Sequence, residues 1–366
     1  MVRSSFSKPR TSVRAGLRLG VVFIAVAATL VGCSSAAAPN ASPRPKPSGS
    51  IDVPSTSSTD ALVAAAQKEG GLNLYSAAVP NALALLAGAF TGMYNIPVNV
   101  TRLVSVPLQT QFTAEVEAGK PVADIVQMSD SDWMSKTATA DQWFETPDPA
   151  DVPSVAKWPK NYILGGQAYL QSLGLYDIAY NSDVVTGKDI PKTWKDVLDK
   201  KWQGKIMLVD PRSNNAQLAW MYEMDKLYGD DFLKKLGALK PQYSLSTAVG
   251  INSVASGDAA MIVPTNHWSN TPLIAAGAPI VDTYPSPTTS AEEWMAMVKN
   301  SPHPAAAKLF LNFALSPYGQ LAMCKDLCTS VLNVPGTIPF PAKYISPPIT
   351  EAVADRAHLL ALLGLK

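Results

Sequence analysis

The sequence is poor in the residues on which catalysis and metal binding usually depend. Its 366 residues include three histidines and three cysteines, and only 16% are Asp, Glu, Lys or Arg. It contains no G-x-S-x-G, H-E-x-x-H or phosphate-loop motif, so no pattern indicates a hydrolase, a zinc protease or a nucleotide-binding enzyme. We therefore expect a protein that is not an enzyme and that has neither a cofactor nor a resident metal.

An excess of positive charge is also missing. Lys and Arg number 30 and Asp and Glu number 29, which gives a formal net charge of +1. Five basic residues and no acidic one precede Cys33, so a chain that begins at Cys33 changes from +1 to −4. A mildly acidic protein has no broad positive field to attract nucleic acid, and we exclude nucleic acid as a partner.

Residues 1–32 have the pattern of a secretory signal peptide. Basic residues up to Arg18 precede an uncharged run at 19–32, which is too short for a stable membrane span. The run ends in Leu-Val-Gly-Cys, which resembles the lipobox of bacterial lipoproteins. That resemblance implies cleavage before Cys33, acyl chains such as palmitate on its thiol and new amino terminus, and an extracytoplasmic protein anchored to the outer face of the cell membrane. A chance cysteine behind a signal peptide is the alternative.

Residues 33–59 are expected to form a disordered tether. Ser, Ala and Pro dominate this stretch, and it has almost no large apolar side chains whose burial could offset the entropy of ordering. The chain as a whole is 47% hydrophobic. The roughly 300 residues after the tether are enough for two lobes with sizeable cores.

Cys324 and Cys328 remain as an even pair of cysteines in an oxidising compartment. On a continuous helix this spacing places their Cα atoms near the upper limit for a disulfide. A bridge is therefore expected if the helix ends there, and two reduced, half-buried thiols are the alternative. A metal pair is disfavoured because no further Cys or His lies nearby in the sequence.

Apolar periodicity predicts alternating strands and helices after residue 60. The predicted strands cover residues 72–75, 97–101, 123–126, 173–180, 205–209, 259–263 and, as the last one, 279–281. Helices are predicted between most of these strands and again at 305–315, 318–327 and 352–365. Such alternation is typical of α/β proteins with parallel strands, in which ligands bind beyond the carboxyl ends of the strands.

The stretch 191–215 leads a strand into a polar turn. Apolar residues at helical spacing predict a short amphipathic helix before strand 205–209, namely Trp194, Val197, Leu198 and Trp202. Ser213, Asn214 and Asn215 then precede another apolar-periodic run. Such a turn leaves backbone N–H groups unpaired at the positive end of a helix, which suits an anion. The alternative is that Ser213 or Asn214 only caps the helix.

Three more predicted strands end in small or polar residues. These are Ser76 and Ala77 after the first strand, Ser129 and Asp130 after the third, and Asn266, His267 and Trp268 after strand 259–263. Asp130 and Asp132 flank one serine without the glycine and the distant glutamate of a calcium loop, so helix capping is favoured over a metal site. For the lone His267, a structural hydrogen bond is the alternative to a ligand contact.

The order of these motifs resembles the extracellular solute-binding proteins of ABC importers, in the branch that includes the ferric-ion-binding proteins. The block PKTWKDVLDKKWQGKI carries the most specific part of this resemblance. The other similar segments, all between residues 60 and 320, are GLNLYSA, ADIVQMSD, LYDIAYNSDVV, DPRSNN, INSVASGDAAMIV and AAAKLFLNFALSPYGQ.

This resemblance implies an α/β, two-lobed periplasmic-binding-protein fold of type II that closes on its ligand by hinge motion. It also implies a membrane permease and a cytoplasmic ATPase as partners, and we expect a monomer. Lobe 1 is predicted at 60–165 with about 275–320, lobe 2 at 166–274, and a helical segment that packs on the lobes at 321–366.

The ferric-ion ligands of the family do not carry over. Ferric-binding members use an adjacent pair of tyrosines before a tryptophan, where this chain has Asn266 and His267 before Trp268. The family's histidine after the first strand and its acidic ligand after the third have no clear counterpart. Because Fe(III) prefers phenolate and carboxylate oxygen, bare ferric ion is disfavoured, whereas the polar turn at 213–215 is retained.

We therefore predict a binding protein for a small anionic solute: a phosphonate, a phosphate ester, a carboxylate or a metal–anion complex. The residues of the four polar turns are predicted to contact it: Ser76, Ala77, Ser129, Asp130, Ser213, Asn214, Asn215, Asn266, His267 and Trp268. The alternatives are a ferric-ion or iron-chelate binding protein, an extracytoplasmic hydrolase, and a binding lipoprotein that serves a sensor.

Overall fold

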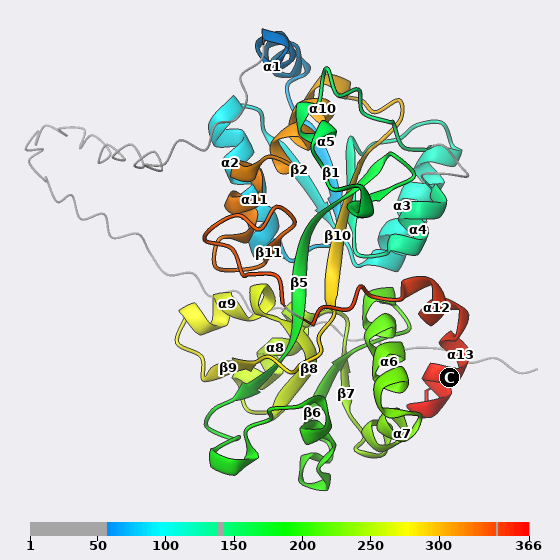
Figure 1. Ribbon diagram of the computed structural model, residues 1–366, viewed down its shortest axis with the longest axis vertical. Coiled ribbons are helices and arrows are strands. Elements are labelled where there is room, and N and C mark those ends of the chain that lie inside the picture. The colour runs from blue at the N-terminus through cyan, green and yellow to red at the C-terminus, as the bar shows by residue number, and fades with distance from the viewer. Residues whose placement is uncertain (1–56, 138–142, 342, 366) are drawn as a thin grey trace, which may run out of the picture. The chain divides into compact units, whose positions relative to one another are not determined.

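One long strand, β5 (Ala168–Asn181), runs through both lobes of the protein, and the shorter strand β10 (Ser290–Met297) lies beside it where the lobes meet (Figure 1). The computed structural model describes residues 57–137, 143–341 and 343–365. Both lobes lie within one compact unit, Ile51–Lys366. The predicted signal peptide, Cys33 and all but the end of the predicted tether lie outside the described residues.

The first lobe begins with parallel strands separated by helices. Strand β1 pairs in parallel with β2 on one side and β3 on the other. The crossing connections are helices, as the alternating periodicity predicts, and they place apolar side chains such as Leu83, Leu86 and Phe90 in the core. The elements are α1 (Ser57–Glu69), β1 (Leu72–Ser76), α2 (Pro80–Tyr94), β2 (Val98–Arg102), α3 (Ser105–Glu117), β3 (Ile125–Met128) and α4 (Ser131–Lys136), followed by α5 (Pro153–Ala156) and β4 (Ile163–Leu164).

The second lobe repeats this arrangement. Strand β6 pairs in parallel with β7 and with β8, and helices cover the sheet. The elements are β6 (Ile206–Val209), α6 (Asn215–Tyr228), α7 (Asp231–Ala238), β7 (Gln242–Ser244), α8 (Thr247–Ala255), β8 (Met261–Asn266), α9 (His267–Ala275) and β9 (Ile280–Thr283). The predicted strand–turn–helix order is therefore present in both lobes.

The strands that join the lobes are β5 (Ala168–Asn181) and β10 (Ser290–Met297), and they pair antiparallel. Strand β10 also pairs with β3 of the first lobe, and β5 with β8 and β9 of the second. The sheet order is thus β2-β1-β3-β10-β5-β8-β6-β7. The prediction that 279–281 is the last strand was wrong, because β10 follows it. The sequence does not reveal β10, since Glu292 and Glu293 interrupt its apolar pattern although both side chains are buried.

Two predicted helices are also divided. Residues 191–202 form two 3-10 turns, Trp194–Leu198 and Lys200–Trp202, because Asp199 between them is extended, with φ −64° and ψ 132°. Trp194, Val197 and Trp202 are nevertheless buried, as the apolar spacing predicts. The last predicted helix is split at Asp355 into α12 (Ile349–Ala354) and α13 (Arg356–Leu362).

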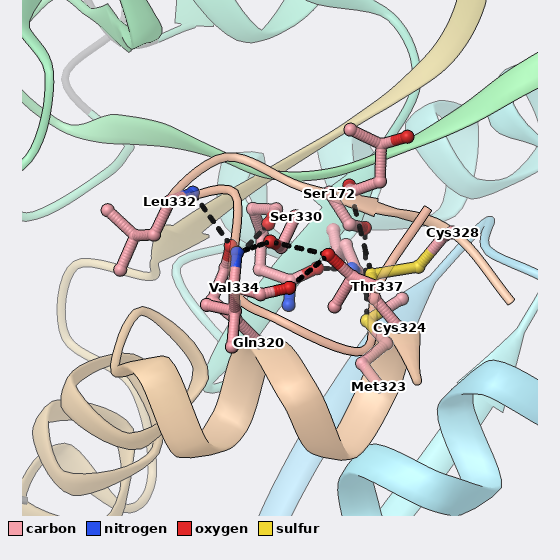
Figure 2. The surroundings of a disulfide bond; sticks show 12 residues. Ser172, Gln320, Met323, Cys324, Cys328, Ser330, Leu332, Val334 and Thr337 are labelled. Carbon is pink, nitrogen blue, oxygen red and sulfur yellow. Dashed lines mark hydrogen bonds between the residues drawn. A yellow bond between two sulfur atoms is a disulfide. The ribbon is translucent and has the colours of Figure 1, made fainter. Parts of the chain in front are cut away.

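A disulfide joins Cys324 and Cys328 at the end of α11 (Pro317–Cys324), which follows α10 (Pro304–Ala314). Figure 2 shows that the loop after it folds back on the helix: Leu332 N donates to Gln320 Oε1, and Val334 N donates to Ser330 Oγ. Within this loop β11 (Thr329–Ser330) pairs with β5. The helix ends at the first cysteine, which is the condition under which this spacing permits a bridge.

In residues 57–137, 143–341 and 343–365, no helix combines the length and the apolar character needed to cross a bilayer.

The disulfide should stabilise the protein modestly, because it closes a short loop. We expect the double variant Cys324→Ala/Cys328→Ala to lose about 2 kcal/mol in the free energy of unfolding, chiefly because the unfolded chain regains entropy. Equilibrium denaturation in urea measures this loss. Reductant should shift the natural protein to the midpoint of the variant and leave the variant unchanged, and a natural protein that is insensitive to reductant would contradict the expectation.

Gly174 on β5 should tolerate no side chain, because a Cβ there would lie 2.3 Å from Cζ2 of Trp268. We expect Gly174→Ala to lower the free energy of unfolding by about 1–3 kcal/mol through overpacking. The matched control is Gly88→Ala in α2, where an added Cβ meets nothing within 4 Å and the helix gains up to about 1 kcal/mol. Thermal or urea unfolding measures both variants against the natural protein. A Gly174→Ala variant as stable as the natural protein would argue against the close packing of Gly174 on Trp268.

Candidate functional site

A cavity of about 40 Å³ lies between the lobes. Residues of the first lobe, the second lobe and both crossing strands line it. They are Ala77, Val79, Arg102, Val104, Ser105 and Ser129 from the first lobe, Tyr176, Ala291 and Glu293 from the crossing strands, and Asn214, Ala216, Gln217, Ser246, Thr247, Asn266 and Trp268 from the second lobe.

A larger hollow of about 810 Å³ lies elsewhere, on the surface of the second lobe. Exposed lysines and aspartates of residues 188–201 and of α7 line it, and several of them already pair with each other, as Lys201 does with Asp189 at 2.7 Å. The interlobe cavity is the better candidate because buried polar groups from separate parts of the chain converge on it.

The walls of the interlobe cavity are positively polarised by helix ends. The first residues of α3, α6 and α8 line it, with Ser105, Ala216 and Thr247 among them. The N-terminus of a helix carries a partial positive charge and unpaired N–H groups, both of which favour an anion. At α3 and α8 no side chain caps the helix, whereas Asn214 Oδ1 accepts from the N–H groups of Ala216 and Gln217 at the start of α6.

Arg102 adds a full positive charge at the end of β2. Its Nε donates to the carbonyl oxygen of Ala78 at 3.2 Å, which orients the guanidinium at the cavity wall. Burial lowers the pKa of Arg102, and the nearby charge of Glu293 opposes that shift. Within the described residues Arg102 has no ion-pair partner, so its charge is available to a ligand.

Glu293 of β10 provides the opposite charge, and its side chain is buried, with 2% of the residue exposed. Ser129 Oγ donates to Glu293 Oε1 at 2.8 Å, but Oε2 has no hydrogen-bond partner among the described residues. Burial raises the pKa of Glu293 to about 7, although the hydrogen bond from Ser129 and the charge of Arg102 both lower it. The carboxyl group therefore exchanges its proton near neutral pH.

Two more buried polar atoms in the lining residues have no hydrogen-bond partner in the part of the chain that the structure describes. They are Nε1 of Trp268 and Oε1 of Gln217, on residues that are 1% and 2% exposed. An unpaired buried polar group is unfavourable by about 1–3 kcal/mol, so such groups at a cavity favour a ligand that completes their hydrogen bonds. The lining residues thus carry one unpaired N–H donor and two unpaired oxygen acceptors, counting Oε2 of Glu293.

The structure brings five of the residues predicted from the polar turns to this cavity: Ala77, Ser129, Asn214, Asn266 and Trp268. Four lining residues that matter electrostatically were not predicted, namely Arg102, Tyr176, Gln217 and Glu293. Arg102 was the one with a signal in the sequence, because it is a charged residue directly after a predicted strand.

The other predicted residues do not line the cavity, and they form hydrogen bonds within the protein. Ser76 Oγ donates to Gln127 Oε1 at 2.9 Å, and Ser213 Oγ donates to the Asp210 carbonyl oxygen at 3.2 Å. Asn215 of the second lobe donates to Asp130 of the first, which also accepts from the backbone N–H of Trp133 at 3.0 Å. Asp130 therefore both caps α4, as the sequence favours, and joins the two lobes.

His267, the first residue of α9, does not line the cavity, and its ring contacts a carboxylate instead. Its Nδ1 lies 2.6 Å from Oδ2 of Asp282, and Asn270 Nδ2 donates to Oδ1 of the same residue at 2.8 Å. Nearby Asp177 is fully buried, and burial together with the charge of Asp282 raises its pKa well above the usual range. This geometry matches the structural hydrogen bond that the sequence leaves open for His267.

Among the described residues, Asp225, Asp230 and His358 bring three possible metal-ligand atoms within 4.8 Å of one another. Lysines compete for the two carboxylates: Lys226 Nζ lies 3.4 Å from Asp225 and Lys234 Nζ lies 2.9 Å from Asp230. None of the three residues lines the interlobe cavity. The cluster therefore provides no ligands for the candidate site.

Known proteins resemble this chain in sequence. The model of a family described as bacterial extracellular solute-binding protein matches residues 58–321. An uncharacterized protein of Haemophilus influenzae is 30% identical over 138 residues, which are 36% of this chain and 40% of the length of that protein.

Solved structures share the fold. The periplasmic binding protein AfuA from Actinobacillus pleuropneumoniae, solved with exogenous fructose-6-phosphate bound, is 21% identical with a TM-score of 0.66, covering 81% of this chain and 99% of that one. Iron-bound HitA from Pseudomonas aeruginosa is 21% identical with a TM-score of 0.62, covering 80% and 98%. The substrate-binding protein of an ABC transporter from Agrobacterium tumefaciens is 17% identical with a TM-score of 0.69, covering 80% and 95%.

These findings confirm the predicted two-lobed fold and the predicted resemblance. Because the family model matches most of the chain, the protein belongs to the bacterial extracellular solute-binding proteins.

Proposed function

We propose that this protein is the binding component of an ABC importer, which captures a small anionic solute between its lobes and delivers it to a membrane permease. The observation that carries this proposal is the interlobe cavity, where Arg102 and the N-termini of α3, α6 and α8 converge. Together they supply positive potential in a place that closure removes from water, where electrostatic attraction is stronger. The ligand classes that fit are phosphonates, phosphate esters, carboxylates and metal–anion complexes.

The sequence supports a tethered form of this receptor. A lipid on Cys33 would hold the lobes at the outer face of the membrane through the tether at 33–59, close to the permease and its cytoplasmic ATPase. AfuA was solved with a phosphorylated sugar, which is an anion of a class that the cavity suits. We infer a monomeric receptor without catalytic activity; the lack of a G-x-S-x-G, H-E-x-x-H or phosphate-loop motif in the sequence supports the second part of this inference.

Ferric ion is the second candidate, since HitA was solved with iron bound. The donors of this cavity support it less well. Tyr176 is the only tyrosine of the lining, and burial and the nearby Glu293 raise its pKa strongly, which disfavours the phenolate that Fe(III) prefers. Asn266, at the position of a family tyrosine, accepts a hydrogen bond from Ser269 Oγ at 2.6 Å. An iron chelate with a negatively charged chelator still fits the anion proposal.

Replacing Arg102 should weaken anion binding selectively. We expect Arg102→Met to lower the affinity for the best anion about 10- to 150-fold, because a charged hydrogen bond is worth about 1.5–3 kcal/mol. The ligand is first found by thermal shift with phosphate, phosphonates, sugar phosphates, carboxylates and ferric citrate, since a bound ligand raises the melting temperature. Isothermal titration calorimetry then measures both affinities.

Arg212→Met is the matched control, because this guanidinium is exposed and pairs with Asp210 at 2.7 Å outside the lining. Its affinity should equal that of the natural protein. A panel in which no anion raises the melting temperature would argue against the proposed function, as would an Arg102→Met variant that binds normally. Turnover of a phosphate ester or carboxylate ester would instead favour the hydrolase alternative.

A further inference from the structure

The interlobe cavity contains both signs of charge, which an anion alone does not match. The Arg102 guanidinium and the Glu293 carboxyl group shift each other's pKa through space, yet neither forms an ion pair within the described residues. Glu293 instead accepts from Ser129, and its second oxygen has no partner. A pure anion drawn in by Arg102 would therefore approach a second negative charge.

The unpaired atoms of the wall are mostly acceptors. Oε2 of Glu293 and Oε1 of Gln217 need two hydrogen-bond donors, whereas Nε1 of Trp268 needs one acceptor. The oxygens of an anionic group satisfy Trp268 but neither of the two acceptors. An ammonium group carries three N–H donors, while a hydroxyl group carries one, so the ammonium group satisfies both acceptors and the hydroxyl does not.

From this arrangement we propose that the solute is a small zwitterion, with its anionic group at Arg102 and a protonated amine at Glu293 and Gln217. The inference rests on the proposed function and narrows its ligand class. Each charge of such a solute meets the opposite charge of the wall, so the closed cavity holds no uncompensated charge.

A zwitterion and an anion without an amine change the protonation of Glu293 in opposite directions, so the protons released or taken up on binding distinguish the two ligand classes. The titratable groups that face Glu293 are Arg102 of β2 and Tyr176 of β5, while its neighbour Glu292 hydrogen-bonds Tyr344 and Ser346 instead. An ammonium group keeps Glu293 ionised, so binding lowers its pKa from about 7 and releases protons. An anion without an amine raises that pKa, so Glu293 takes up a proton and donates it to the ligand.

The test compares matched pairs of ligands by calorimetry at pH close to the pKa of Glu293. The pairs are glycine and acetate, β-alanine and propionate, and aminomethylphosphonate and methylphosphonate. Repeating each titration in two buffers with different ionisation enthalpies counts the protons exchanged, after the titration of the free ligand is subtracted. We expect the amine-bearing member of at least one pair to bind about tenfold tighter or more and to release about half a proton.

Glu293→Gln should abolish the preference for the amine and the release of protons, whereas Glu117→Gln, on an exposed residue of α3, should preserve both. The proton count on the natural protein decides the matter even if Glu293→Gln does not fold. If the amine-free members bind as tightly or take up protons, the zwitterion inference is wrong and the anion function stands. If no member of any pair binds and none of the wider anion panel raises the melting temperature, both proposals fail.

Discussion

The antiparallel pairing of β5 and β10 is the constraint on which the rest of the structure depends. Every residue of both strands is buried, and the pair extends the sheets of both lobes. The same strands carry Tyr176 and Glu293 at the cavity and Gly174 under Trp268. The strands that join the lobes therefore also form part of the cavity wall, so the same backbone positions the polar groups and connects the two lobes.

Burial of Glu293 gives this wall its chemical character. A carboxyl group so deeply buried is usually paired, yet one of its oxygens and two further polar atoms of the lining residues have no partner within residues 57–137, 143–341 and 343–365. All three of these unpaired atoms belong to residues that line the interlobe cavity. Interlobe bonds such as Asn81 Nδ2 to the Trp268 carbonyl oxygen, at 2.6 Å, join the two lobes.

The sequence was sufficient for most of the parallel strands, because each of those has an apolar run and a polar turn of its own. It did not predict the parallel strand β7, whose three residues, Gln242–Ser244, contain no apolar run. It did not predict β10, whose two glutamates look like surface residues until Ser129, Tyr344 and Ser346 are placed beside them. The polar turns were predictable because they are local. The roles of Arg102 and Gln217 were not, since a sequence does not tell which side chain at the end of a strand or the start of a helix faces the other lobe.

The long detour of the chain between β3 and β10 has a consequence for folding. The first lobe receives its last central strand only at residues 290–297, after the strands of the second lobe have been made, so the first lobe is not a continuous segment of the chain. Pairing partners this far apart in sequence favour slow folding. The first lobe therefore completes its sheet only late in the synthesis of the chain.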